Sequence, residues 1–449
     1  MKNGNEPADQ RLARIQASLQ RRHRSERRFR SIGLTAVMVG LGLVGLLFAT
    51  ILSKGLPAFW QATVVADVYF DPEIIKIDAR PVQQADETPA QFRQRDLAWQ
   101  TRLTMVNWNR IIENTLLRHV PEAESQRARL RALVTSGERF ALRDRVMVDP
   151  SLIGQTVSLP LLADANVDVW LKGNIDRSLP DSQQQLHPQV REWADRLHER
   201  GVIQMKFSTA LFMNPDSRSS LASAGLGGAF VGSLYMMAIV ILLAVPIAVA
   251  SAIYLEEFAP KSRFTDLVEV NINNLAAVPS IIFGLLGAAV FINWFKMPLS
   301  APLVGGLVLS LMTLPTVIIA TRSTLKAIPP SIRQAALGIG ASKVQTVFHH
   351  VLPLALPGIL TGAIIGVAQA IGETAPLLLI GMSAFVASVP GTPLDQSTAL
   401  PVQIYLWQGN ELRNFFEART SAAIIVLLAL MLSMNALAIW LRKRFETRW

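Results

Sequence analysis

Residues 326–381 read KAIPPSIRQAALGIGASKVQTVFHHVLPLALPGILTGAIIGVAQAIGETAPLLLIG and combine a polar hairpin with a long apolar run. In the first half, S-x-x-Q capping signatures begin at Ser331 and at Ser342 and predict the starts of two short helices. Each signature precedes apolar residues at helical spacing, so both helices are expected to be amphipathic. The apolar run that follows is long enough to cross a membrane. This order predicts a water-side helical hairpin that leads directly into a membrane helix.

The pattern of the hairpin leaves two interpretations open. Pro329 and Pro330 prevent an upstream helix from running through, while Gly338 and Gly340 end the first short helix. Its small residues would let a partner protein approach closely, which favours a docking element. Alternatively, an amphipathic hairpin between two apolar runs lies on the lipid headgroups.

The composition of the chain predicts a membrane protein with one water-soluble part. Of its 449 residues, 51% are hydrophobic and only 17% are charged, which is too apolar for an ordinary soluble protein. The net charge is +10, but the basic residues cluster beside apolar runs, so membrane topology explains them better than nucleic-acid binding. The chain has no cysteine, which excludes disulfides and cysteine-based metal sites. We expect no cofactor.

Six apolar runs predict an all-α polytopic membrane protein with six transmembrane helices. The runs cover residues 32–52, 226–254, 273–295, 302–319, 354–380 and 422–441. The expected organisation is a basic cytoplasmic tail (1–31), a first transmembrane helix (32–52), an inserted segment (53–222) and a helical core (223–449). The core contains five further transmembrane helices and the hairpin 326–352.

The charges predict which side of the membrane each part faces. Between residues 322 and 350 there are lysines and arginines but no aspartate or glutamate, as expected for a cytoplasmic loop. The basic N-terminal and C-terminal segments are also expected inside, which agrees with six spans. The segment 53–222 then lies outside.

The inserted segment 53–222 is charged, lacks any long apolar run and is long enough for a core of its own. We expect it to be a mixed α/β domain. Helices are predicted over 91–120, 123–133 and 189–200, a strand over 201–212, and strand-like runs with turns over 145–170. The segment shows no metal-ligand pattern and no pair of nucleophile and base.

A few polar side chains are candidates for the interior of the membrane part. Glu373 lies within an apolar run, where a carboxylate costs about 2.5–3.5 kcal/mol and normally faces protein or water. Gln369 precedes it by one helical turn on the same face, and Thr374 follows it. Arg322 is the best available counter-ion, or it extends to the cytoplasmic interface; its guanidinium also suits an anion with phosphate-like oxygens. A transport pathway and a structural carboxylate between helices both fit Glu373.

Nucleotide binding is not expected in this chain. The glycine-rich letters GIGASK at 338–343 lack the G-x-x-x-x-G-K-[ST] spacing of a phosphate-binding loop. If ATP drives the protein, a separate subunit binds it, and this chain is a transport subunit without enzyme activity.

Several motifs resemble one family. The hairpin is similar to the EAA loop of ABC importer permeases, with the motif positions at Gln334, Ala335, Ala336, Gly340, Leu352 and Pro353. Gln334 stands for the usual Glu and His350 for the usual Ile. Further motifs are IYLEEFAP from 253, NNLAAVPSIIFGLLG from 273, LPTVIIATRSTLKAIP from 314 and GETAPLLLIG from 372. Over about residues 30–55 and 205–449 the chain resembles the PstA-type permease subunits of phosphate-specific importers, although Gln369 stands where that family has Arg.

The resemblance implies a type I ABC importer permease in the bacterial inner membrane that transports inorganic phosphate by alternating access. Its expected partners are a PstC-type permease subunit, two copies of a PstB-type ATPase, a periplasmic phosphate-binding protein and membrane lipid. The loop 331–353 would couple to the ATPase. Arg322 and Glu373 match charged membrane residues linked to transport. Two alternatives stay open: a permease for another anion or small solute, and a membrane-anchored sensor in which 53–222 is the active part.

Overall fold

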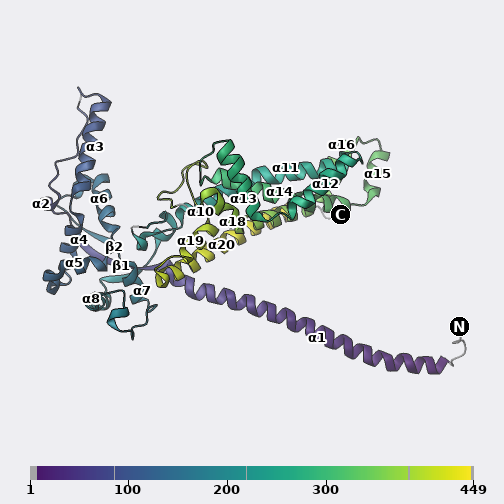
Figure 1. Ribbon diagram of the computed structural model, residues 1–449, viewed down its shortest axis with the longest axis horizontal. Coiled ribbons are helices and arrows are strands. Elements are labelled where there is room, and N and C mark those ends of the chain that lie inside the picture. Colours follow the sequence, from purple (N-terminus) through teal and green to yellow (C-terminus); the bar gives the residue numbers. More distant parts are fainter. Residues whose placement is uncertain (1–7, 85, 219, 383–384, 446–449) are drawn as a thin grey trace. The chain divides into compact units, whose positions relative to one another are not determined.

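The computed structural model describes residues 8–84, 86–218, 220–382 and 385–445, and the chain divides into two units at Lys54 (Figure 1). The described part of the first unit is helix α1 (Ala8–Gly55), which is continuous and whose last residue, Gly55, already belongs to the second unit. The predicted basic tail and the predicted first transmembrane helix therefore belong to one continuous helix. The apolar part of α1 has no buried residue, so its side chains are available to lipid or to another protein.

The second unit begins with a small antiparallel sheet of order β2-β1-β3. The central strand β1 (Trp60–Tyr69) pairs with β2 (Thr156–Leu162) on one side and with β3 (Ile203–Phe207) on the other. The strands β2 and β3 lie within the predicted strand-like stretches. The sequence patterns did not predict β1, although it supplies most of the pairing.

Helices surround this sheet and complete the mixed α/β fold of the insertion. They are α2 (Pro72–Ile75), α3 (Pro89–Met105), α4 (Trp108–Leu117), α5 (Arg127–Leu130), α6 (Glu138–Val148), α7 (Ala165–Leu171), α8 (Pro188–Glu199) and α9 (Thr209–Met213). The predicted helix 189–200 is confirmed as α8. The predicted helix 91–120 is interrupted, because Val106 is extended and the Asn107 side chain caps a new helix by accepting from the backbone N–H of Arg110.

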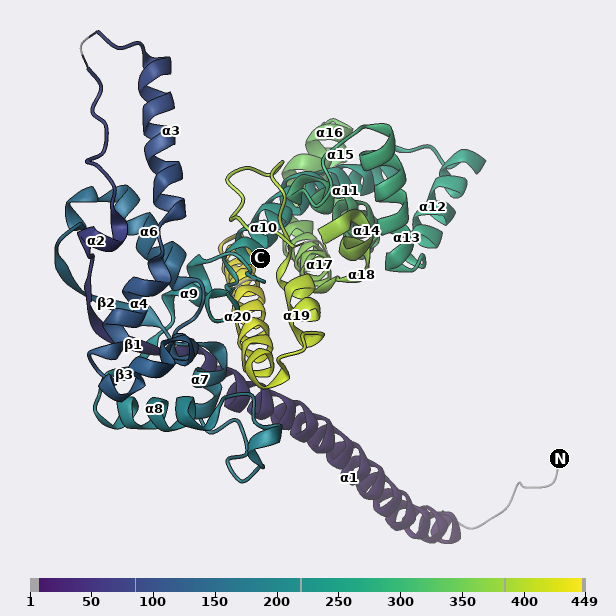
Figure 2. The same cartoon turned by 60° about the vertical axis from the view of Figure 1, so that its left-hand side comes forward.

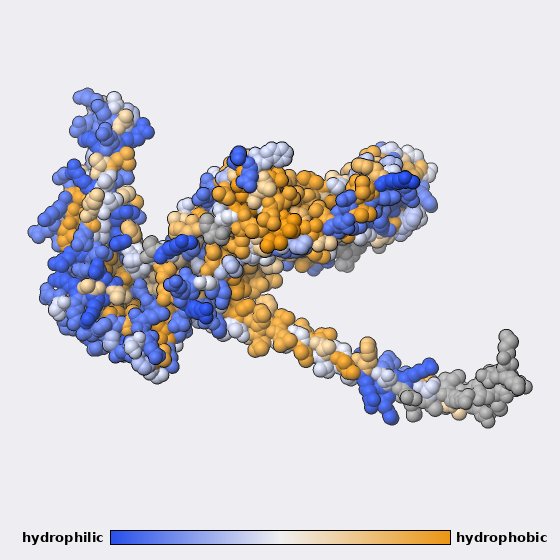
Figure 3. Space-filling model, viewed as in Figure 1, coloured by the Kyte–Doolittle hydropathy of each residue, from blue (hydrophilic) through white to orange (hydrophobic). Residues whose placement is uncertain are grey.

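The membrane part consists of long apolar helices. Among the described residues, five helices are long and apolar enough to span a membrane, and a bent pair raises the number to six if it counts as one span. After α1, the core elements are α10 (Gly227–Ile239), η7 (Val240–Ala244), α11 (Val245–Ile253), η8 (Tyr254–Phe258), α12 (Arg263–Ala276), α13 (Ser280–Gly287), η9 (Ala288–Trp294), α14 (Pro302–Ala327), α17 (Leu352–Gly372), α18 (Ala375–Leu377), η11 (Leu378–Met382), α19 (Leu400–Gln408) and α20 (Arg413–Phe445). Figure 3 shows the hydrophobic surface over these helices and the hydrophilic surface of the insertion. The all-α membrane architecture with a small α/β insertion is thus confirmed.

Two predicted spans differ from straight helices. The third bends by 102° between α12 and α13, where Pro279 lacks a backbone N–H and disfavours helical geometry in the residue before it. The residues that precede the third apolar run are helical as well, since Ser262 caps α12. The fifth stops at Gly372, because Glu373 has an extended backbone. The apolar length was predicted in both cases, but the break was not.

Close packing of α14 against α17 depends on glycine. A Cβ added at Gly362 would lie 2.4 Å from the Cβ of Ala320, and one at Gly366 would lie 2.9 Å from side-chain atoms of Thr313 and Val317. Small residues at such positions let two membrane helices approach closely. Helix α14 leads into the hairpin, and α17 follows it.

The insertion and the last helices share one hydrophobic core. Phe70 and Leu103 of the insertion belong to the same buried cluster as Trp407 and Phe416. At the junction, buried Arg419 of α20 donates to the carbonyl oxygens of Ala222 (2.7 Å) and Ala224 and to Oε1 of Gln61 in β1. The insertion is therefore packed onto α19 and α20, and neither α19 nor this junction was predicted.

Candidate functional site: the hairpin and its charge network

The hairpin contains α15 (Pro330–Gly338), α16 (Lys343–Thr346) and η10 (Val347–Val351). The second predicted capping box is confirmed, because Ser342 Oγ accepts from the N–H of Gln345 while the Gln345 side chain accepts from the N–H of Ser342. The first is wrong. Helix α15 starts at Pro330, whose fixed φ suits the first helical position, so Ser331 lies inside the first turn and caps nothing.

The turn between the two helices depends on Gly340. Its φ is +93°, in the left-handed region that side chains disfavour, and a Cβ there would meet no atom within 4 Å. Any other residue at this position is strained by its backbone rather than by crowding. The surface around Gly340 is open, as a docking element requires.

Exposed apolar side chains lie on both sides of this turn in the sequence. Leu337, Ile339, Val344 and Phe348 are each at least 50% exposed, and we call these four residues the hairpin patch. In the first predicted apolar stripe, which consists of Ile332, Ala335, Ala336 and Ile339, only Ala336 is buried and Ile339 is 83% exposed, whereas Val347 and Val351 of the second stripe are buried. The first stripe therefore faces outward at its C-terminal end. Gln334 and Ala335 are exposed next to it.

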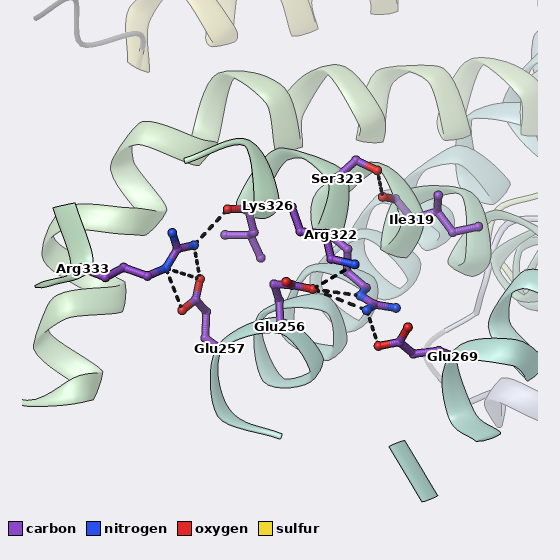
Figure 4. A network of polar contacts seen from close by, with 9 residues as sticks. Glu256, Glu257, Glu269, Ile319, Arg322, Ser323, Lys326 and Arg333 are labelled. Atoms are coloured by element: carbon purple, nitrogen blue, oxygen red, sulfur yellow. Dashed lines mark hydrogen bonds and ion pairs between the residues drawn. The ribbon is translucent and has the colours of Figure 1, made fainter. Parts of the chain in front are cut away.

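Arg333 fastens the base of the hairpin to the membrane helices (Figure 4). Its guanidinium forms a forked ion pair with Glu257 of η8, with a shortest distance of 2.6 Å. It also donates to the carbonyl oxygens of Leu325 and Ile328, both at 2.9 Å, which lie at the C-terminal end of α14. Helix ends leave such carbonyl groups without intrahelical partners, so one side chain caps α14 and joins it to α15 and η8.

Arg322 precedes Leu325 by less than one turn of α14 and is paired with two carboxylates. It lies 3.4 Å from Glu256 of η8 and also contacts Glu269 of α12, while Lys326 lies 3.7 Å from Glu256 (Figure 4). The Arg322 side chain is only 11% exposed. The predicted pairing of Arg322 with Glu373 is therefore wrong, because nearer carboxylates on η8 and α12 neutralise the guanidinium. Of these two partners, Glu256 belongs to the motif IYLEEFAP, whereas Glu269 lies outside the motifs singled out in the sequence.

The other predicted membrane residues lie in the last turn of α17 and at the break that follows it. Glu373 and Thr374 are half-buried and Gln369 is exposed. Within the described part of the chain, the Glu373 carboxylate has no hydrogen-bond or ion-pair partner. The predicted link of Glu373 to a pathway stays a prediction. No cluster of three or more His, Asp or Glu side chains that could hold a metal ion occurs among the described residues.

The fold and the hairpin together define a helical, multi-spanning membrane permease. Residues 222–449 match the family model of the binding-protein-dependent transport system inner membrane component, and the chain belongs to that family. This confirms the family resemblance of the hairpin and of the motifs around it. Residues 16–181 match a domain of unknown function, DUF3333.

Some of the similar proteins are named as phosphate transport permeases, and others are named as ABC transporter proteins without mention of phosphate. The chain is 30% identical to the phosphate transport system permease protein PstA of Yersinia pestis, over 53% of this chain and 79% of that protein. It is 32% identical to PstA 2 of Mycobacterium tuberculosis, over 50% and 74%. It is 31% identical to the probable ABC transporter permease protein YqgI of Bacillus subtilis, over 40% and 59%. A solved structure of the MetNI methionine ABC transporter aligns with a TM-score of 0.40 and 16% identity, over 49% of this chain and 97% of that chain.

Proposed function

We propose that this chain is the membrane permease subunit of an ATP-driven importer of inorganic phosphate in the bacterial inner membrane. The names of the PstA relatives and the PstA-like motifs support phosphate as the solute. The proposed partners are a PstC-type permease, two copies of a PstB-type ATPase and a periplasmic phosphate-binding protein. Both termini and the hairpin lie in the cytoplasm in this proposal, and the domain 53–222 lies outside.

Coupling to the ATPase is proposed to pass through the hairpin patch. One observation carries this step: the patch is exposed at the turn, while Arg333 ties the base of the same hairpin to α14 and η8. A force on the patch is therefore transmitted to two membrane elements through a forked ion pair and two backbone hydrogen bonds. Gln334, Ala335, Ala336, Gly340, Leu352 and Pro353 form the proposed contact region and its ends.

Anion passage is proposed to involve Arg322. In this structure two carboxylates balance its charge, so a passing phosphate would compete with Glu256 and Glu269 for the guanidinium. A rearrangement of η8 and α12 relative to α14 would expose the positive charge in one state and neutralise it in the other. Gln369, Glu373 and Thr374 are proposed to line the same route at the break after α17.

The coupling step is tested with two glycine substitutions of matched backbone strain. Gly340→Asp should abolish co-purification of the ATPase subunit and phosphate uptake. The control Gly173→Asp alters a glycine of the insertion that also has a positive φ, +72°, and open space around it. This control variant should retain both co-purification of the ATPase subunit and phosphate uptake. Retention of uptake in Gly340→Asp, at normal membrane levels, would contradict the coupling role.

The solute is tested by measuring ATP-dependent uptake of labelled phosphate, sulfate and other anions in reconstituted vesicles. Uptake of another solute in preference to phosphate would identify a permease for that solute. A sensor would instead lose its function on deletion of 53–222 and tolerate Gly340→Asp. The two rival functions therefore give separate outcomes.

A further inference from the structure

A patch of exposed apolar side chains lies at the base of the insertion. It consists of Leu56, Trp60, Phe207, Phe212 and Met213, which are 37–74% exposed, and we call it the basal patch. Trp60 packs edge-on against Phe207 with ring centroids 6.1 Å apart, and Phe207 stacks on Phe212 at 5.8 Å. The three aromatic side chains of the patch are thus in continuous contact.

The sheet and a helix cap bring these side chains together. Trp60 at the start of β1 is the direct cross-strand neighbour of Phe207 at the end of β3. The Ser208 side chain then caps α9 by accepting from the N–H of Leu211, and this turn brings Phe212 back over Phe207. Phe59, beside Leu56 in the preceding helical turn, stacks on Phe212 at 5.7 Å.

Contacts with two membrane helices place the basal patch at the end of their apolar parts. A Cβ at Gly55, directly before Leu56, would lie 2.6 Å from Ile425 in the first turns of the apolar part of α20. A Cβ at Gly227, the first residue of α10, would lie 2.7 Å from the carbonyl oxygen of Met213. Figure 2 shows α9 between the sheet and the start of α10. The residues flanking the patch therefore touch the ends of two spans on the same side.

Aromatic residues at the ends of membrane-spanning helices have a preferred environment. Tryptophan and other aromatic side chains are enriched where the hydrocarbon of a bilayer meets the headgroups, because one part of the ring system is apolar and the other tolerates water. The same rings in bulk water would leave a large apolar area hydrated. Because the basal patch lies at the ends of α10 and α20, lipid is favoured over water as the environment of these side chains.

We propose that the basal patch inserts into the headgroup region of the bilayer leaflet that faces the insertion. The occupant of this surface is lipid, and the insertion is held against the membrane by its base as well as by its chain connections. The depth expected for such an interfacial contact is about 5–10 Å. This role goes beyond the proposed transport function, which assigns nothing to residues 53–222.

The absence of cysteine from the chain permits a direct test by spin labelling. Full-length Met213→Cys and Phe207→Cys variants are labelled in liposomes, and the accessibility of each label to oxygen and to a water-soluble nickel complex is measured. A control label replaces Val148, which is 83% exposed. The segment that follows Val148 reaches the end of β1 opposite Trp60, because the N–H of Gly154 donates to the carbonyl oxygen of Phe70.

Lipid insertion predicts an oxygen-to-nickel accessibility ratio at positions 207 and 213 that is severalfold above the ratio at position 148. The difference should disappear in a lipid-free amphipol. Equal ratios at all three positions in liposomes would overturn the proposal. Labels that are shielded from both reagents only when a second permease subunit is present would also overturn it, since the occupant would then be protein.

Discussion

Arg333 illustrates how one residue determines the geometry of the hairpin. Its guanidinium satisfies the Glu257 carboxylate, whose side chain is 7% exposed, and two carbonyl groups at the end of α14. Lysine could not replace it, because an ammonium group lacks the planar fork that reaches both partners. A single side chain therefore decides whether the hairpin and α14 move together.

We expect Arg333→Gln to lower stability by about 3 kcal/mol, since removal of one member of a largely buried pair leaves a buried charge unpaired. Glu257→Gln in the same chain should restore part of this loss, because the second substitution removes the unpaired charge. Thermal unfolding in detergent micelles measures both effects. Strictly additive losses in the double variant would show that the two residues are not coupled.

A second residue-scale expectation concerns pH. Burial raises the pKa of the Glu138 carboxyl in the insertion, although the N–H of Leu162 donates to it. The folded chain then binds more protons than the unfolded chain between the two pKa values, so this group destabilises the fold as pH rises through its folded pKa. We expect Glu138→Gln to raise the Tm at neutral pH and to do so less at acidic pH.

Asp96→Asn serves as the opposite control for this pH series. The hydrogen bond from Arg80 lowers the pKa of Asp96, so its contribution to stability is present at neutral pH and is lost as pH falls through the folded pKa. Asp96→Asn should lower the Tm at neutral pH. An identical pH response in the two variants would contradict the assigned causes.

At the scale of elements, the contact between α14 and α17 determines how force from the hairpin reaches the membrane interior. The two helices approach closely because Gly362 lies directly against Ala320. Both helices connect to the hairpin, one at each end. Their packing therefore decides whether the hairpin acts on a rigid pair or on two separate helices.

Gly362→Ala is expected to destabilise the protein by about 1–3 kcal/mol, because the added methyl group would overlap with Ala320 in a close-packed contact. The compensating change Ala320→Gly should recover much of the loss. Thermal unfolding and phosphate uptake are the measurements. A Gly362→Ala variant with unchanged Tm and uptake would show that the helices separate without cost.

At the scale of the whole second unit, Arg419 connects the insertion to the permease core. It donates to the carbonyl groups of Ala222 and Ala224 and to Gln61, while its guanidinium lies 4.6 Å from the ring centroid of Phe415. The insertion and α20 are thus parts of one packed structure. A conformational change of α20 would carry the insertion with it.

We expect Arg419→Leu to loosen this junction and to increase proteolysis and hydrogen exchange in β1 and around Ala222. The buried carbonyl groups would lose their donor, which costs about 1–3 kcal/mol for each group left without a partner. The exposed Arg413 at the start of the same helix provides the control Arg413→Leu. This control should change neither proteolysis nor hydrogen exchange in β1 and around Ala222. Equal protection in both variants would mean that the packed core alone holds the insertion.

Much of the local structure followed from the sequence. The capping box at Ser342, the turn at Gly340, the helix α8 and the lengths of the apolar runs depend on residues close together in the chain. Two local predictions were wrong, and both errors have local causes. Helix α15 begins at Pro330, so Ser331 does not cap it. The third apolar run bends at Pro279, although its hydropathy gave no indication of a break.

The sequence by itself determined the membrane class, the family and the position of the hairpin, because apolar length and motif spacing are written in neighbouring residues. Only the tertiary structure decided the charge partners. Arg322 meets Glu269, 53 positions away, and Arg333 meets Glu257, 76 positions away. Arg419 meets Gln61 across 358 positions. Such pairs form when packing brings distant segments together in a low-dielectric interior, where a buried charge without a partner is costly, and no local pattern specifies which partner is met.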